Sequence, residues 1–194
     1  FCMDAFCVTL PFPMNLSEQM TALAKNAKAA AHQMTRLSTT DKNACLFAMA
    51  DAIETHAVSI KEANAMDMET ARAMDLSQPM LDRLLLDDAR IAGMAQGLRE
   101  VAELPDPVGR VLDERDRPSG LKLKKIAAPI GVVVMIYESR PNVTADAAGL
   151  CFKSSNVTIL RGGKEALHSN QIIARLMAEA GQSACDAFPK YAID

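Results

Sequence analysis

Apolar residues recur at helical spacing through the first half of the chain, and this pattern predicts helices before any strand. Residues 16–104 contain no glycine before Gly93 and are rich in good helix formers, chiefly Ala, Met, Leu, Glu and Lys. An S-x-x-D sequence at Ser38 starts one helix, and Pro105 stops the last one. The predicted helices span 17–35, 40–56, 58–74, a short stretch that Ser77 caps and Leu85 ends, and 88–103.

After Pro105 the helical pattern gives way to strands. Residues 105–120 combine proline, glycine and many charges, which is typical of a surface loop with short extended pieces. Residues 121–126 alternate apolar and basic side chains and predict a half-buried strand. Residues 131–137 are continuously apolar and rich in valine, which predicts a strand buried on both faces of a parallel sheet.

Strands and helices then alternate to the end of the chain. The pattern predicts a helix over 142–153, a strand over 156–160, a tight turn at 161–164, a helix over 165–180 with Gly181 as its C′ residue, and the start of a third strand at 191–194. The order β-α-β-α-β is that of a doubly wound parallel sheet. The predicted fold class is therefore α/β, with N-terminal helices followed by a Rossmann-like parallel sheet that is truncated.

Composition adds limits on the class of protein. The 194 residues are 49% hydrophobic and 23% charged, as in an ordinary globular domain. A net charge of -3 argues against a basic nucleic-acid-binding module, and no apolar run approaches the length of a membrane helix. Residues 115–164 nevertheless hold nine basic and three acidic residues. This basic window is either a solvated face or a site for an anionic ligand.

The five cysteines are odd in number and form no C-x-x-C pair, and the three histidines are scattered. These spacings predict reduced thiols in a cytoplasmic protein and no metal site. Residues 1–13 begin without methionine, carry Asp4 as their single charge, and lack the clear basic region and cleavage site of a signal peptide. We expect Met14 to be the native initiator and residues 1–13 to be extraneous.

Two turns follow the predicted buried strands, where open parallel sheets bind ligands. In the second turn, Gly162 and Gly163 allow close approach of the backbone, Arg161 and Lys164 add cations, and the next helix presents a positive N-terminus. These features suit a phosphorylated ligand, and an ordinary βα turn would show them too. In the first turn, Asn142 either caps a helix or donates its amide to a developing oxyanion.

The residues around these turns resemble γ-glutamyl phosphate reductase, also called glutamate-5-semialdehyde dehydrogenase, of the aldehyde dehydrogenase superfamily. The similarity runs from about Met14 to the last residue. The segments that carry it are Ile136–Thr144 (IYESRPNVT), Asp146–Cys151 (DAAGLC), Ser155–Ala166 (SNVTILRGGKEA), Met80–Leu84 (MLDRL) and Asp106–Gly109 (DPVG).

The resemblance implies an enzyme that reduces L-glutamyl 5-phosphate with NADPH to L-glutamate 5-semialdehyde and phosphate, the second step of proline biosynthesis from glutamate. It implies that a cysteine thiolate attacks the acyl phosphate and that Asn142 helps form the oxyanion hole. It assigns the cofactor to Arg161, Gly162, Gly163 and Lys164, where an arginine suits a 2′-phosphate, and the substrate to Arg140. It further implies a cytoplasmic homo-oligomer without nucleic-acid or membrane partners.

The chain departs from this family in one decisive respect. The family's nucleophilic cysteine lies in a later catalytic domain, and none of the five cysteines here has an equivalent place. We therefore expect residues 14–194 to be a partial NADP-binding domain that is inactive alone. Ser139 and Ser155 stand where the family more often has alanine and glycine. The alternatives are another acyl-phosphate or aldehyde dehydrogenase, part of a bifunctional protein with a glutamate kinase upstream, and a non-catalytic nucleotide-binding module.

Overall fold

The computed structural model describes residues 15–194, so the predictions about residues 1–13 and Met14 lie outside the described residues. Five helices come first, and each ends within one residue of its predicted position. They are α1 (Leu16–Met34), α2 (Thr39–Thr55), α3 (Ala57–Ala73), α4 (Gln78–Leu84) and α5 (Asp88–Glu103). No helix of the described part of the chain is both long and apolar enough to cross a bilayer.

Side-chain caps explain why these helix starts could be read from the sequence. Asn15 and Glu18 form a capping box at α1, and Ser38 forms the same reciprocal pair of hydrogen bonds with Asp41 at α2. Asp87 accepts a hydrogen bond from the backbone N–H of Arg90 at the start of α5. Each cap satisfies an N–H group that the helix itself leaves unpaired.

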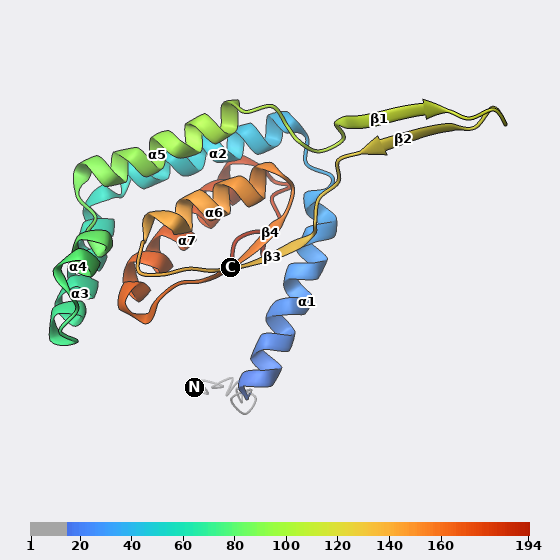
Figure 1. Ribbon diagram of the computed structural model, residues 1–194. Coiled ribbons are helices and arrows are strands. Elements are labelled where there is room, and N and C mark those ends of the chain that lie inside the picture. The colour runs from blue at the N-terminus through green and yellow to red at the C-terminus, as the bar shows by residue number, and fades with distance from the viewer. Residues whose placement is uncertain (1–14) are drawn as a thin grey trace, which may run out of the picture.

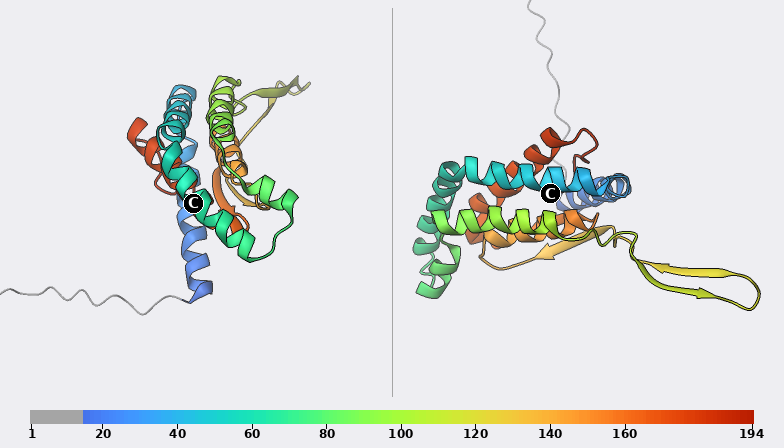
Figure 2. Two further views of the ribbon diagram at one scale, coloured as in Figure 1. Left: turned by 90° about the vertical axis from the view of Figure 1, so that its left-hand side faces the viewer. Right: turned by 90° about the horizontal axis from the view of Figure 1, so that it is seen from above.

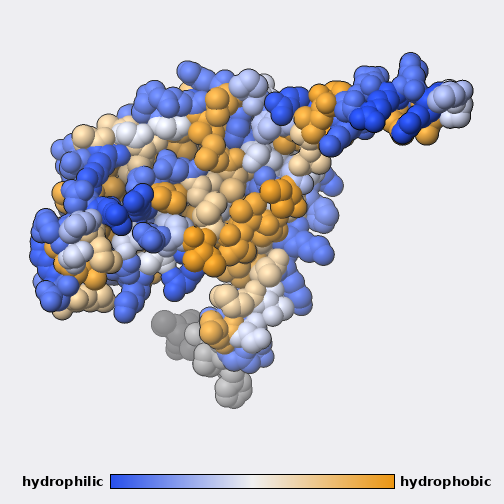
Figure 3. All heavy atoms as spheres, viewed as in Figure 1, coloured by the Kyte–Doolittle hydropathy of each residue, from blue (hydrophilic) through white to orange (hydrophobic). Residues whose placement is uncertain are grey.

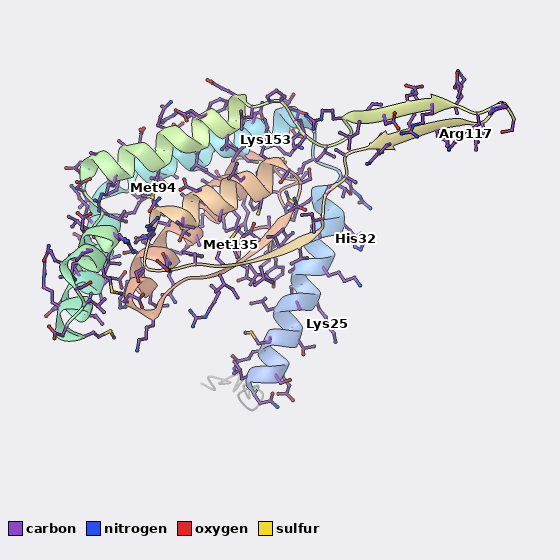
Figure 4. The ribbon with its side chains drawn as sticks, viewed as in Figure 1. Lys25, His32, Met94, Arg117, Met135 and Lys153 are labelled. Carbon is purple, nitrogen blue, oxygen red and sulfur yellow. The ribbon has the colours of Figure 1, made fainter. Side chains whose placement is uncertain are left out.

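A two-stranded antiparallel hairpin projects from the body of the molecule (Figure 1), and Arg117 lies at its tip (Figure 4). It consists of β1 (Val111–Asp116) and β2 (Lys122–Ile126). The prediction of a half-buried strand over 121–126 is wrong, because every residue of β2 is exposed. Among the described residues no second layer covers the hairpin, so the apolar alternation has no core to face.

The parallel sheet is small and lies beneath the helices (Figure 1). In it β3 (Val132–Ile136) pairs with β4 (Val157–Arg161), and Ile193 bridges Thr158 in the parallel sense, where the third strand was predicted to begin. The prediction that β3 is buried on both faces is wrong, since Val134 and Ile136 are 58% and 77% exposed. Figure 3 shows the apolar band that they form on the surface.

The two helices of the parallel unit are α6 (Asn142–Lys153) and α7 (Leu167–Ala184), and a short 3-10 turn, η1 (Lys164–Ala166), precedes α7. Gly181 does not end the last helix as predicted, because α7 continues to Ala184. Phe188 packs so closely on Gly181 that a Cβ there would lie 2.7 Å from the Cδ2 atom of Phe188. This glycine therefore permits close packing and does not act as a cap.

The helices form two layers above the sheet. Helices α2 and α5 run side by side as an outer layer (Figure 2), and they pack on α7 and α6 respectively. Helix α6 in turn packs on β4, and α1 contacts both strands of the sheet. Aliphatic side chains fill the space between these layers, among them Leu46, Met49, Ile53, Leu98 and Ile173.

A buried polar cluster joins the outer helices to α6. The Lys42 ammonium pairs with the Asp106 carboxylate and donates to Ser155 Oγ at 3.1 Å. Lys153, labelled in Figure 4, donates to Asn43 Oδ1 at 2.6 Å and to the carbonyl of Ala102. Burial alone would raise the pKa of Asp106, but hydrogen bonds, above all from Lys42, hold it below its ordinary value. The cluster thus places two lysines and one carboxylate inside the fold.

Candidate functional site

The four residues predicted to bind the cofactor line one cavity at the carboxyl end of β4. This cavity, of about 370 Å³, is lined by Arg161, Gly162, Gly163 and Lys164 together with residues of α7 and Asp194. The Arg161 guanidinium donates to the carbonyl of Gly162, and no ion pair holds Lys164 among the described residues. Two cations therefore face a single cleft at the edge where parallel sheets bind ligands.

Side chains lie close to both glycines of this turn. A Cβ at Gly162 would clash with the Asn170 amide and lie 3.2 Å from the Tyr137 ring. A Cβ at Gly163 would lie 2.7 Å from the Glu165 carboxyl carbon. The absence of side chains at these two positions leaves the backbone of the turn uncovered.

The N-terminus of α7 is already occupied. The Asp67 carboxylate, from α3, accepts hydrogen bonds from the backbone N–H groups of His168 at 3.1 Å and of Ser169 at 2.7 Å. A carboxylate at this position neutralises the positive end of the helix. The prediction that this helix presents a free positive N-terminus to a ligand is therefore wrong. The groups at this turn that could meet an anion are therefore Arg161, Lys164 and the backbone of the turn.

Asn142 and Arg140 line a second cavity, of about 400 Å³, between α4, α5 and the start of α6. Asn142 is not the helix cap that one interpretation allowed, because Pro141 holds that position and no side chain caps α6. The Asn142 amide instead donates to Asp146 Oδ2 at 3.2 Å. Desolvation raises the pKa of Asp146, and the hydrogen bond from Asn142 opposes this. The amide is thus held at the mouth of the cavity.

Several arginines surround this second cavity, and they differ in how they are held. Arg90 donates to Asp82 and to the carbonyl of Leu85, which fixes it against α4. Arg83 lies 3.8 Å from the carboxylate of Glu138. Within residues 15–194 no hydrogen bond or ion pair holds the guanidinium of Arg140. It is therefore free to meet an anion.

No family model matches the chain. It is 52% identical over 168 residues to a gamma-glutamyl phosphate reductase of Syntrophomonas wolfei, over 87% of the chain and 40% of the relative. A gamma-glutamyl phosphate reductase of Clostridium novyi is 52% identical over 171 residues, 88% of the chain and 41% of that relative. The chain is a homologue of gamma-glutamyl phosphate reductases. It spans about two fifths of the length of these curated relatives.

Solved structures agree with this. The gamma-glutamyl phosphate reductase of Thermotoga maritima superposes with a TM-score of 0.86 at 35% identity, covering 90% of this chain and 42% of that one. The gamma-glutamyl phosphate reductase of Saccharomyces cerevisiae superposes with a TM-score of 0.84 at 35% identity, covering 94% of this chain and 46% of that one. A probable aldehyde dehydrogenase of Listeria monocytogenes, at a TM-score of 0.65 and 15% identity, shares the fold. The predicted resemblance and the α/β fold class are both confirmed.

The cysteines of the described residues are placed away from both cavities. Cys45 and Cys151 are buried and Cys185 is half-buried, and none of the three lines either cavity. Burial, followed by the neighbouring Cys185, raises the pKa of Cys45 to about 12, so its thiol is inert at neutral pH. Among the described residues no group of three or more His, Cys, Asp and Glu side chains could hold a metal.

Several residues that line the first cavity carry no role that the sequence pattern indicates. Tyr137 and Asn170 lie against the glycine turn, and Asp194 closes the same cavity. Tyr137 belongs to the segment YESRPNVT, and the family resemblance of this segment is the sequence feature that could have marked it as a site residue. Asn170 lies in the second turn of a helix with an ordinary amphipathic pattern, and nothing in that pattern marks it.

Proposed function

We propose that the chain is part of an oxidoreductase that converts L-glutamyl 5-phosphate to L-glutamate 5-semialdehyde and phosphate with NADPH, in proline biosynthesis from glutamate. The observation that carries the proposal is that Arg161, Gly162, Gly163 and Lys164 line one cavity in a homologue of gamma-glutamyl phosphate reductases. Homology supports the reaction class, and the chemistry of this cavity supports the cofactor. Neighbouring aldehyde dehydrogenase folds support a nicotinamide cofactor in general.

The cavity fits a dinucleotide with an additional phosphate. At Gly162 and Gly163 a Cβ would collide with neighbouring side chains, so the backbone itself forms the wall that a ligand would meet. Arg161 and Lys164 supply the cations, and a guanidinium suits the 2′-phosphate that distinguishes NADPH from NADH. When bound, NADPH would supply the hydride that reduces the acyl group.

The second cavity would receive the reacting end of the substrate. Asn142 would donate its amide to the oxygen that becomes negatively charged, and its hydrogen bond to Asp146 keeps the amide oriented. Arg140, with no partner among the described residues, would bind an anionic group of the substrate. Both roles require the substrate to lie in the cavity at the start of α6.

The thiolate that the reaction needs would come from outside this chain. None of the described cysteines lines either cavity, and the chain spans about two fifths of its curated relatives. We therefore propose that residues 14–194 are a partial NADP-binding domain that is inactive alone. We further propose that the complete enzyme is a cytoplasmic homo-oligomer that acts on a small molecule, without nucleic-acid or membrane partners.

Assays of the full-length enzyme with glutamate 5-semialdehyde, phosphate and NADP test this function. We expect phosphate-dependent formation of NADPH, and no turnover by residues 14–194 alone. Arg161→Ala should weaken NADPH binding more than NADH binding, because only NADPH carries the 2′-phosphate. Equal losses would contradict the assigned role of Arg161. Cofactor binding without turnover in the full-length protein would favour a non-catalytic nucleotide-binding module.

A further inference from the structure

Three polar side chains from three different elements form a continuous hydrogen-bonded chain beside the glycine turn. The Tyr137 hydroxyl, just after β3, lies 2.7 Å from Thr144 Oγ1 in the first turn of α6. Thr144 Oγ1 lies 3.0 Å from Asn170 Oδ1 on α7. Thr144 is fully buried, whereas Tyr137 and Asn170 line the cofactor cavity. The threonine hydroxyl thus joins two side chains of the cavity wall from behind.

The directions of these hydrogen bonds follow from the protons available. The Thr144 hydroxyl has one proton, and it donates this proton to Asn170 Oδ1, which can only accept. It must therefore accept from Tyr137, whose hydroxyl keeps its proton because burial raises the pKa of Tyr137. With its oxygen as acceptor the Asn170 amide turns its Nδ2 group toward Gly162. Each group in the chain has a defined role.

Tyr137 and Asn170, the two ends of this hydrogen-bonded series, are the side chains closest to Gly162. A Cβ at that glycine would clash with Asn170 Nδ2 and lie 3.2 Å from Tyr137 Cε2. The backbone N–H of Tyr137 also donates to the carbonyl of Arg161 at 3.2 Å. The wall against which the turn packs is therefore held by Thr144, two residues beyond Asn142 on α6.

We propose that Thr144 is a positioning residue whose buried hydroxyl holds the Arg161–Lys164 turn in register with the helix that carries Asn142. This inference rests on the proposed function of the cavity only where cofactor binding is measured. The placement of the turn is a property of the unliganded protein and can be tested without a cofactor.

Amide hydrogen exchange in the full-length protein tests the placement directly. Thr144→Val keeps the shape of the side chain but leaves Tyr137 and Asn170 without their shared partner. We expect the amide of Tyr137, which donates to the carbonyl of Arg161, to exchange about tenfold faster in this variant, and at the wild-type rate in Thr144→Ser. Tyr137→Phe, which breaks only one of the two bonds, should give an intermediate rate and decides the matter if Thr144→Val does not fold.

A matched control exists on the neighbouring strand. Thr158 is fully buried on β4, and its Oγ1 is a buried side-chain atom with no hydrogen-bond partner among the described residues. Thr158→Val makes the same chemical change as Thr144→Val without breaking a hydrogen bond, so exchange at the Tyr137 amide should not change. Equal exchange in the two valine variants, or loss of protection in Thr144→Ser, would overturn the proposal.

Cofactor binding supplies the second readout. The dissociation constant for NADPH should rise about tenfold in Thr144→Val and stay near the wild-type value in Thr144→Ser and Thr158→Val. The KM for glutamate 5-semialdehyde should not change, because neither Tyr137 nor Asn170 lines the cavity of Arg140 and Asn142. A general loss of folded enzyme would instead lower activity and leave both constants unchanged. If the wild-type protein binds no NADPH, the proposed function fails while the exchange result still decides the role of Thr144.

Discussion

The buried carboxylate of Asp67 accepts a 2.7 Å hydrogen bond from the backbone N–H of Ser169. These residues lie 102 positions apart, and the bond ties α3 to the first turn of α7. Because α7 follows directly after the glycine turn and η1, this contact fixes the helix from which Asn170 lines the cavity beside that turn. A carboxylate that a local pattern would place on a helix surface thus supports the candidate site.

Replacing Asp67 should destabilise the protein measurably. In Asp67→Asn the carboxamide can accept from only one of the two N–H groups, and the charge opposite the helix N-terminus is lost. We expect the free energy of unfolding to fall by about 2 kcal/mol, measured by urea-induced unfolding. Glu69→Gln, an exposed change of the same kind on the same helix, is the control and should have little effect. Equal stability of the two variants would contradict this role.

Ser155 combines an unfavourable backbone conformation with a buried hydrogen bond. Its φ of 57° lies in the left-handed region, and its Oγ accepts from the buried Lys42 ammonium. Ser155→Ala keeps the strain and loses the hydrogen bond, whereas Ser155→Gly loses the hydrogen bond but removes the strain. We therefore expect the alanine variant to be less stable than the glycine variant by about 1 kcal/mol in urea-induced unfolding.

Asp75 provides the matched comparison for Ser155. It has a similar φ of 55° but is exposed. The stability difference between Asp75→Gly and Asp75→Ala should match the difference found at Ser155, because both report the backbone conformation alone. If Ser155→Gly is less stable than Ser155→Ala, backbone strain does not explain the glycine that the family more often has at this position.

Asp106 should make the stability of the fold depend on pH in acid. Its pKa lies below the ordinary value of 3.8, because hydrogen bonds, chiefly from Lys42, outweigh the effect of burial. A lowered folded pKa contributes stability that is fully present above the unfolded pKa and is lost as the pH falls through the folded pKa. Unfolding measured between pH 7 and pH 2 should therefore show a loss below about pH 4 that Asp106→Asn reduces.

The same variant should be less stable at neutral pH. Asp106→Asn leaves the Lys42 ammonium, 2% exposed, without an opposite charge inside the fold. We expect a loss of about 2–3 kcal/mol at pH 7. Asp113→Asn breaks an exposed ion pair with Arg115 and should change stability by less than about 1 kcal/mol. A loss at Asp106 no larger than at Asp113 would exclude a structural role for the buried pair.

Gly162 should be intolerant of a side chain. In Gly162→Ala the new methyl group would collide with the Asn170 amide and crowd the Tyr137 ring, so the turn must move. We expect the affinity for NADPH to fall about tenfold, measured by fluorescence titration of the full-length protein. Gly97→Ala, on α5, places its Cβ in ordinary contact at 3.8 Å from Asp146 and should bind NADPH normally. Unchanged binding by Gly162→Ala would contradict a close approach at this turn.

Local patterns determined the helices and the placement of the turns. The capping boxes at Asn15 and Ser38 and the proline that ends α5 act within a few residues of one another, so their helix boundaries could be read directly. The glycine turn at Gly162 and Gly163 could be read for the same reason. The sequence could not show which faces of the strands are buried by other elements of the fold. The alternation in β2 and the valines of β3 are compatible with burial, and yet β2 is exposed throughout and β3 is only half-buried, with Val134 and Ile136 exposed.

By itself the sequence determined the α/β class, the resemblance to gamma-glutamyl phosphate reductases and the residues of the two turns. Only the tertiary structure decided which partners those turns have. It placed Asp67 on the N-terminus of α7 and Thr144 between Tyr137 and Asn170. These contacts join residues that are distant in sequence or that belong to different elements of the fold. Periodicity does not reveal them, because a hydrogen bond depends on which groups meet in space, whereas a sequence pattern reports only positions a few residues apart along the chain.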